Sequence, residues 1–292
     1  MLAAGVAGCS ATGLFNWMET FKSRMQASTR PLRLLPLIRA EGLFKGLWGV
    51  GLGPSALSMG LASSLRMGLY ERTRDGLQAR AAPPFGELPH EKSASSVALA
   101  GLVTGLVAYP LATPFFSLKT NLQSRHGVIC PSTGLYTTGN AVGSPPVLNP
   151  YTLSPARILR AAAATFRPQA VLPFTIRGAM FNTGHLWGYD TAKSALTAGG
   201  LPDSPLVHLL SGGLAALSAS LLACPADVVC TLFMSGASPT LGGAVRLVHQ
   251  RHGPAGYWRG AGVLFTRLCP GLVTHSVIYE QLRCCMGLGY LK

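Results

Sequence analysis

The sequence is poor in charged residues. Asp, Glu, Lys and Arg make up only 12% of its 292 residues, against about 25% in soluble domains. Such a chain cannot cover a water-exposed globular surface, and its 48% apolar content excludes a disordered one. Acidic residues are the scarcest: 10 Asp and Glu stand against 24 Lys and Arg, for a net charge of +14. On an apolar chain this excess favours contact with anionic lipid over contact with nucleic acid.

Several chemical motifs are also missing. The seven cysteines are an odd number without a Cys-x-x-Cys pair, so neither a disulfide framework nor a zinc site is predicted. There is no Ser-His-Asp set, phosphate-binding loop or paired carboxylate, and therefore no argument for an enzyme. No cleavage site follows the first helix-like stretch, so we expect no cleavable presequence.

Long stretches with little or no charge are present instead. A membrane span needs about 20 largely apolar residues. Two candidates contain a single arginine each, Arg177 and Arg267, and the others contain no charge. The stretches predict six transmembrane helices, with buried helices of a large soluble protein as the less favoured alternative. They cover residues 2–18, 46–65, 93–118, 168–189, 204–226 and 260–279.

The loops between these stretches differ in charge. Three long loops, 19–48, 119–167 and 230–259, hold 14 Lys and Arg, and the opposite side holds 7. This bias places the long loops on the inside face and both termini on the other. Each long loop also predicts a short helix: one near 31–39, and two that open with Ser154-Pro155 and Ser238-Pro239, serine being the N-cap. Residues 126–149 read as an irregular surface insert.

A threefold repeat marks the ends of the even stretches. Tyrosine, an acid, two residues and a base recur at spacings of 119 and 90 residues. Acid and base three residues apart lie on one helix face, so three such ends can form a ring of ion pairs. The residues are Tyr70, Glu71 and Arg74; Tyr189, Asp190 and Lys193; and Tyr279, Glu280 and Arg283.

With these motifs, the sequence resembles the mitochondrial carrier family over nearly its whole length. Further matches are Glu41-Gly42, Pro225-Ala226-Asp227 and Trp258-Arg259-Gly260. The resemblance implies an all-α membrane protein: six transmembrane helices in a threefold pseudosymmetric carrier barrel, with three short matrix-side helices. It implies residence in the mitochondrial inner membrane, with both termini on the intermembrane-space side. The carrier repeats would cover 1–92, 93–200 (with a loop insert at 126–150) and 201–292.

The resemblance also implies two gates. The tyrosine-containing ends would close the cytoplasmic side. On the matrix side Glu19 would pair with Lys119 and Lys22 with Asp227, and Gln26 and Gln123 would brace these pairs. The family's third acid and third base are replaced by Phe116 and Cys230, and its first proline by Trp17. Because the missing charges are partners of each other, their loss leaves no buried unpaired charge.

Family substrate contact points map to mid-membrane positions thirteen residues before the acids of the repeat. Two arginines at equivalent positions, with no carboxylate expected nearby, favour an anionic solute. A structural arginine bonded to backbone carbonyls is the alternative reading. The predicted substrate-binding residues are Ser58, Met59, Arg177, Gly178, Arg267 and Leu268.

Two functions remain open from the sequence. The first is a solute carrier that exchanges a small anion, a carboxylate being favoured, by alternating access. The second is a carrier-derived structural subunit that no longer transports and is bound to a larger inner-membrane (respiratory) complex, as the departures at Trp17, Phe116 and Cys230 suggest. For lipid, structural cardiolipin is expected at the short-helix N-termini and at Trp258, Arg259 and Gly260. No metal, other cofactor or nucleic acid is expected.

Overall fold

A computed structural model describes residues 1–28, 32–81, 94–125, 129–130, 132–137, 142–200 and 205–287. This part of the chain is helical, with one isolated antiparallel bridge between Ile129 and Tyr136 and no strand. The prediction of an all-α protein is confirmed to that extent. The long helices are α1 (Leu2–Ala27), α3 (Leu52–Ala81), α4 (Ala94–Arg125), α6 (Val171–Ala198), α7 (Pro205–Met234) and α9 (Ala261–Cys285).

These long helices form a closed ring. Each packs against the next along the chain, α1 on α3, α3 on α4, α4 on α6, α6 on α7 and α7 on α9, and α9 returns to α1. The last contact joins the N-terminal end of α1 to the C-terminal end of α9, where Ala3, Ala4 and Ala7 pack with the buried Tyr279. The ring therefore surrounds a central space to which every long helix contributes.

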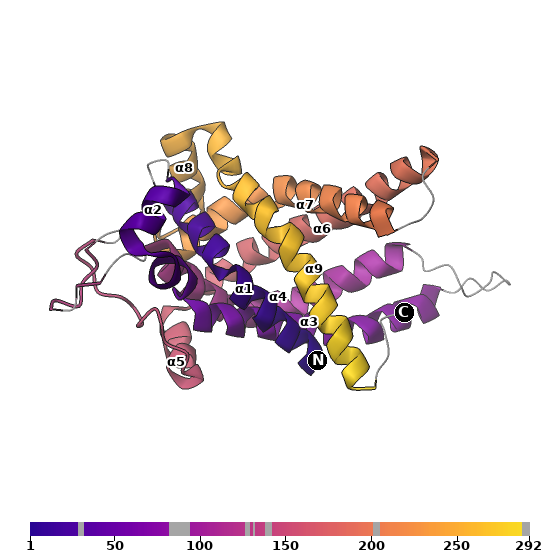
Figure 1. Cartoon of the computed structure of the whole chain (residues 1–292), viewed down its shortest axis with the longest axis horizontal. Helices are drawn as coiled ribbons and strands as arrows, with labels where there is room; N and C mark the ends of the chain where they lie inside the picture. Colours follow the sequence, from indigo (N-terminus) through magenta and orange to yellow (C-terminus); the bar gives the residue numbers. More distant parts are fainter. Residues whose placement is uncertain are drawn as a thin grey trace.

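The shorter helices gather at one end of the ring, on the left in Figure 1. They are α2 (Leu34–Glu41), α5 (Pro155–Thr165) and α8 (Leu241–His252), with a π-helical turn, η1 (Leu43–Trp48), and two 3₁₀ turns, η2 (Pro168–Ala170) and η3 (Pro254–Trp258). Each of the three long loops contains one of the short α-helices, as the sequence predicted.

The predicted caps of the last two short helices were only partly right. Ser154 precedes α5 as its N-cap residue, but its side chain makes no capping hydrogen bond. The third helix does not open at Ser238-Pro239. It begins at Leu241 and is capped by Thr240, whose Oγ1 accepts a hydrogen bond from the Gly243 N–H at 3.1 Å. Ser238 instead donates to the Thr240 carbonyl at 2.8 Å, which holds the turn before the cap.

The two ends of the ring are packed differently. At the short-helix end α1, α4 and α7 contact one another in all three pairings. At the other end α3, α6 and α9 make at most marginal contact with one another among the described residues. The ring is thus closed at the short-helix end and open at the other.

Three stretches in the described part of the chain are long and apolar enough to cross a membrane: Leu102–Arg125, Leu210–Met234 and Pro254–Cys285. The helices α1, α3 and α6 are comparably long, but their described residues contain no such stretch. Much of their length is Gly, Ala, Ser and Thr, small residues that bring helices close together.

The insert is more ordered than the sequence predicted. The Ile129–Tyr136 bridge lies within it, and Tyr136 is buried. Just beyond it, Pro150 accepts a hydrogen bond from the Gly51 N–H at 2.9 Å, and the Tyr151 hydroxyl donates to the Lys45 carbonyl at 3.1 Å. The C-terminal side of the insert is thereby fixed to the turn between η1 and α3.

The seam between α6 and α7 gives a test of the ring. A Cβ added at Gly184 of α6 would lie 2.8 Å from the Ala219 Cα, a backbone atom of α7. A Cβ added at Gly213 of α7 would meet nothing within 4 Å. We expect Gly184→Val to reduce the free energy of unfolding by about 1–3 kcal/mol through overpacking, and Gly213→Val to change it much less. Thermal unfolding of the purified protein in detergent measures both; equal shifts would contradict this seam.

Candidate functional site: a charged cavity at the closed end of the ring

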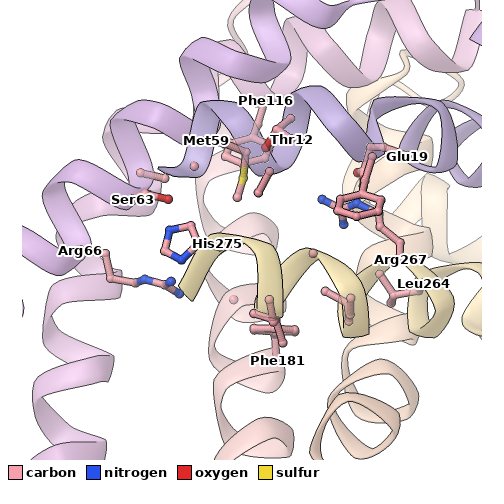
Figure 2. A pocket seen from close by; sticks show the side chains of 18 of the residues that line it. Thr12, Glu19, Met59, Ser63, Arg66, Phe116, Phe181, Leu264, Arg267 and His275 are labelled. Atoms are coloured by element: carbon pink, nitrogen blue, oxygen red, sulfur yellow. The ribbon is translucent and has the colours of Figure 1, made fainter. Parts of the chain in front are cut away.

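A cavity of about 160 Å³ lies inside the ring. All six long helices line it, from α1 through Gly8 to α9 through Arg267. Its wall is mostly apolar, with charged side chains of Glu19, Arg66, Lys119, Arg177 and Arg267. Figure 2 shows Glu19 and Arg267 side by side at one end of this cavity and Arg66 and His275 at the other.

Glu19 is the centre of the first group of charges. Its Oε1 lies 3.3 Å from Lys119 Nζ and 3.4 Å from Lys22 Nζ, and its Oε2 lies 2.6 Å from Arg267 Nε. The last contact is an ion pair without hydrogen-bond alignment, since the buried Oε2 accepts no hydrogen bond. One carboxylate on α1 thus holds cations from α4 and α9.

Asp227 is the centre of the second group. Its Oδ2 lies 2.9 Å from Lys22 Nζ and accepts a hydrogen bond from Gln26 Nε2 at 2.8 Å. Its Oδ1 lies 3.0 Å from Arg177 Nη1. Gln26 is itself held by Thr231, whose hydroxyl donates to Gln26 Oε1 at 2.8 Å. Lys22 therefore touches both carboxylates and joins the two groups into one network.

We call this set the ion network: Glu19, Lys22, Lys119, Arg177, Asp227 and Arg267. Two carboxylates face four cations, which leaves a net charge of +2. Buried charges are tolerated only when they are paired, because an uncompensated one costs several kcal/mol. The pairing therefore both stabilises this end of the ring and leaves it electropositive.

The expectation that no carboxylate lies near the two mid-span arginines is wrong. Arg177 binds Asp227 and Arg267 binds Glu19. Their side chains nevertheless remain 22% and 17% exposed, whereas Lys22 and Lys119 are 2% exposed. The arginines are consequently the members of the network that a molecule in the cavity can reach.

The other predicted contact residues divide into two groups. Met59, Gly178 and Leu268 line the cavity with the arginines. Ser58 does not: it is buried, and its hydroxyl donates to the Ser55 carbonyl at 2.8 Å. Gly178 leaves the space that the Tyr109 ring fills, since a Cβ there would lie 2.4 Å from Tyr109 Cε2.

Phe116 and Cys230 belong to one apolar cluster. The Phe116 ring lies 4.4 Å from the Phe174 ring, and Lys119 Nζ lies 5.2 Å from the Phe116 centroid. Cys230 is buried with its Sγ 3.8 Å from the sulfur of Met234. At the positions where the sequence lacks the acid and base of a third ion pair, the structure has apolar packing.

Gln123 does not brace an ion pair. Its Nε2 donates to Asn16 Oδ1 at 3.0 Å, and Asn16 in turn donates to the carbonyl of Val50 at 3.0 Å. The prediction for Gln123 was wrong because its helix turns the amide toward the start of α3, where buried carbonyls need donors.

The tyrosine-containing ends are only partly described. The side chains of Glu71, Arg74, Asp190 and Glu280 lie outside the described part of the structure. Of the rest, Arg283 donates to the Tyr279 hydroxyl at 3.2 Å. Tyr70, Tyr189 and Lys193 are partly buried near the ends of α3 and α6. The ring of ion pairs predicted for this end stays a prediction.

The residues expected to bind lipid lie at the start of α9. Trp258 is half-exposed and donates through Nε1 to the Leu221 carbonyl at 3.1 Å, and Gly260 is the N-cap of α9 with φ +90°. Arg259 Nη1 lies 3.2 Å from His252 Nδ1. Burial, and then the charge of Arg259, lower the pKa of His252, which favours the neutral imidazole that can accept a hydrogen bond from Arg259.

Arg66, Ser63 and His275 line the cavity but were not among the predicted site residues. One signal was available, because Arg66 is a charge next to an otherwise uncharged stretch. Nothing in the sequence indicated that His275 would face the same cavity from another helix.

Comparison with known proteins agrees with this architecture. The family model described as mitochondrial carrier protein matches residues 202–287. Mitochondrial brown fat uncoupling protein 1 of Rattus norvegicus is 28% identical to the chain, over 97% of the chain and 90% of the relative. The protein of the same name from Bos taurus is 27% identical over the same shares. Both comparisons thus relate the chain to mitochondrial carriers. Members of that family are multi-pass inner-membrane transporters rather than enzymes.

The apolar contact at the closed end of the ring can be tested by restoring the third ion pair. Phe116→Asp alone places an unpaired carboxylate in an apolar cluster and should cost about 3–5 kcal/mol. Adding Cys230→Lys should recover most of that loss, because the two side chains belong to the same cluster. A double-mutant cycle on thermal unfolding measures the coupling. Equal stability of the single and double variants would show that the two positions are not partners.

Proposed function

We propose that this carrier moves a small anion, a carboxylate being favoured, across the inner membrane by alternating access. One observation supports it above the others: Arg177 and Arg267 line the cavity and at the same time hold the two carboxylates of the closed end. A guanidinium binds carboxylate or phosphate through two parallel hydrogen bonds. The likeness to uncoupling proteins favours transport of a proton or an anion, and the +2 charge of the ion network favours the anion.

Binding and opening are linked through these arginines. An anion in the cavity competes with Glu19 for Arg267 and with Asp227 for Arg177. Each ion pair that the anion replaces removes one connection, either between α1 and α9 or between α7 and α6. The buried pairs Glu19–Lys119 and Lys22–Asp227 must then separate, and the energy needed falls because the ligand now pairs with the arginines. The apolar third contact adds no ion pair to be broken.

The proposed topology follows the charge bias and the resemblance. The six long helices would be the transmembrane spans, arranged with threefold pseudosymmetry as repeats 1–92, 93–200 and 201–292. The short-helix end would face the matrix and both termini the intermembrane space. This orientation is supported by the 14 Lys and Arg in the long loops and by the clustering of α2, α5 and α8 at one end. Cardiolipin would bind near Trp258, Arg259 and Gly260.

Uptake of labelled carboxylates and phosphate into liposomes tests transport. We expect the wild type to take up anion above the level of empty vesicles. The uptake rate should fall about tenfold or more in Arg177→Gln and in Arg267→Gln, because each change removes a guanidinium that would bind the solute and leaves a buried carboxylate without that partner. Arg246→Gln, an exposed charge on α8, is the matched control and should transport normally. Absence of uptake of every anion would reject the carrier function.

A structural subunit of a larger complex is the second candidate. The replacement of one ion pair by Phe116 and Cys230 favours it, because a scaffold does not need to open its closed end. Gentle solubilisation followed by sizing separates the two functions. We expect a carrier to run as a small monomer; co-migration of nearly all of the protein with a large inner-membrane complex would favour the scaffold.

A further inference from the structure

We propose that Arg66 and His275 form a second anion-binding subsite, at the opposite end of the cavity from the ion network. Both side chains line the cavity, Arg66 from α3 and His275 from α9. Figure 2 shows the Arg66 guanidinium beside the His275 imidazole, with Ser63 close by and Glu19 and Arg267 at the far end.

The two side chains have unused hydrogen-bonding capacity. In the described part of the structure Arg66 has no ion pair and no hydrogen bond, although it is partly buried. His275 Nε2 is buried and has no hydrogen-bond partner there. The other arginines of the cavity, Arg177 and Arg267, each hold a carboxylate. An unpaired guanidinium beside an unpartnered imidazole nitrogen is completed by an anion.

The chemistry fits a single carboxylate or phosphate group. The guanidinium offers two parallel N–H donors. His275 offers a third when Nε2 carries the proton, and its ring is positioned by stacking on Tyr279, with centroids 6.2 Å apart and planes at 21°. Ser63, on the same helix as Arg66, also lines the cavity, and its hydroxyl is a further hydrogen-bond donor there.

The subsite is too far from the ion network for one small anion to bridge both. His275 follows Arg267 by eight residues on α9, which is about 12 Å along a helix axis. It also lies toward the open end of the ring, where α3, α6 and α9 make at most marginal contact. An anion that enters the cavity therefore meets Arg66 and His275 first and reaches Arg177 and Arg267 second. This order rests on the proposed transport function; the binding itself does not.

Binding is measured first, without transport. Thermal unfolding of the purified protein in detergent is followed against inorganic phosphate and against succinate, at constant ionic strength. We expect Arg66→Gln and His275→Gln to raise the anion concentration for half-maximal stabilisation, by about tenfold for Arg66→Gln. Arg66→Lys should retain part of the effect, because it keeps the charge and loses the paired donors. Arg72→Gln, an exposed arginine on α3, is the control and should match the wild type.

Uptake kinetics in liposomes then separate the two sites. Arg66→Gln should raise KM several-fold with kcat little changed, whereas Arg267→Gln should lower kcat. An anion dependence of unfolding that is the same in Arg66→Gln as in the wild type would overturn the subsite. If no variant transports but the stabilisation depends on Arg66, the subsite stands and the transport function fails. If the wild type transports and Arg66→Gln changes neither the stabilisation by anions nor KM, the transport function stands and the subsite fails.

Discussion

The structure depends on one buried lysine between two carboxylates. Lys22 lies 3.4 Å from Glu19 and 2.9 Å from Asp227, and so connects α1 to α7 and, through Glu19, to Lys119 on α4. Neither carboxylate nor lysine would be tolerated alone at this depth, because an uncompensated buried charge costs several kcal/mol. The closed end of the ring is therefore held by interactions that are strong only in combination, and these can be exchanged when a new ion competes for one partner.

The three sides of the closed end are not equivalent. Two are joined by ion pairs, and the third, between α4 and α7, has Phe116 and Cys230 in an apolar cluster. Polar contacts near the helix ends contribute to that side: the Ser235 carbonyl accepts a hydrogen bond from Arg125 Nε at 2.5 Å and from Asn121 Nδ2 at 3.4 Å. Apolar contacts lack the directional, exchangeable character of ion pairs. This side is consequently the part of the closed end that a competing anion influences least.

Cavity and closed end share the same side chains, which is the physical basis for coupling between them. Arg177 and Arg267 are the most exposed members of the ion network and belong to α6 and α9, whereas the carboxylates belong to α1 and α7. In the proposed transport cycle, a ligand that pairs with either arginine would directly change the contact of α6 with α7 or of α9 with α1. No relay through intervening residues is needed, because coupling requires only that the ligand interact differently with the two states.

The sequence by itself determined the helices, the three short helices of the long loops, and the charged residues that occupy the closed end. Charge-poor stretches and a repeated spacing are local properties, and they survive folding. The partners were decided by tertiary structure. Arg177 and Arg267 were expected without carboxylates, yet each meets one from a helix distant in sequence. Gln123 donates a hydrogen bond to Asn16 instead of bracing an ion pair, and His275 lies beside Arg66 in the cavity. The tilt and rotation of each helix determine which of its side chains meet across the cavity. Small residues packed along the helix seams set this tilt and rotation, and the spacing of residues in one sequence does not reveal them.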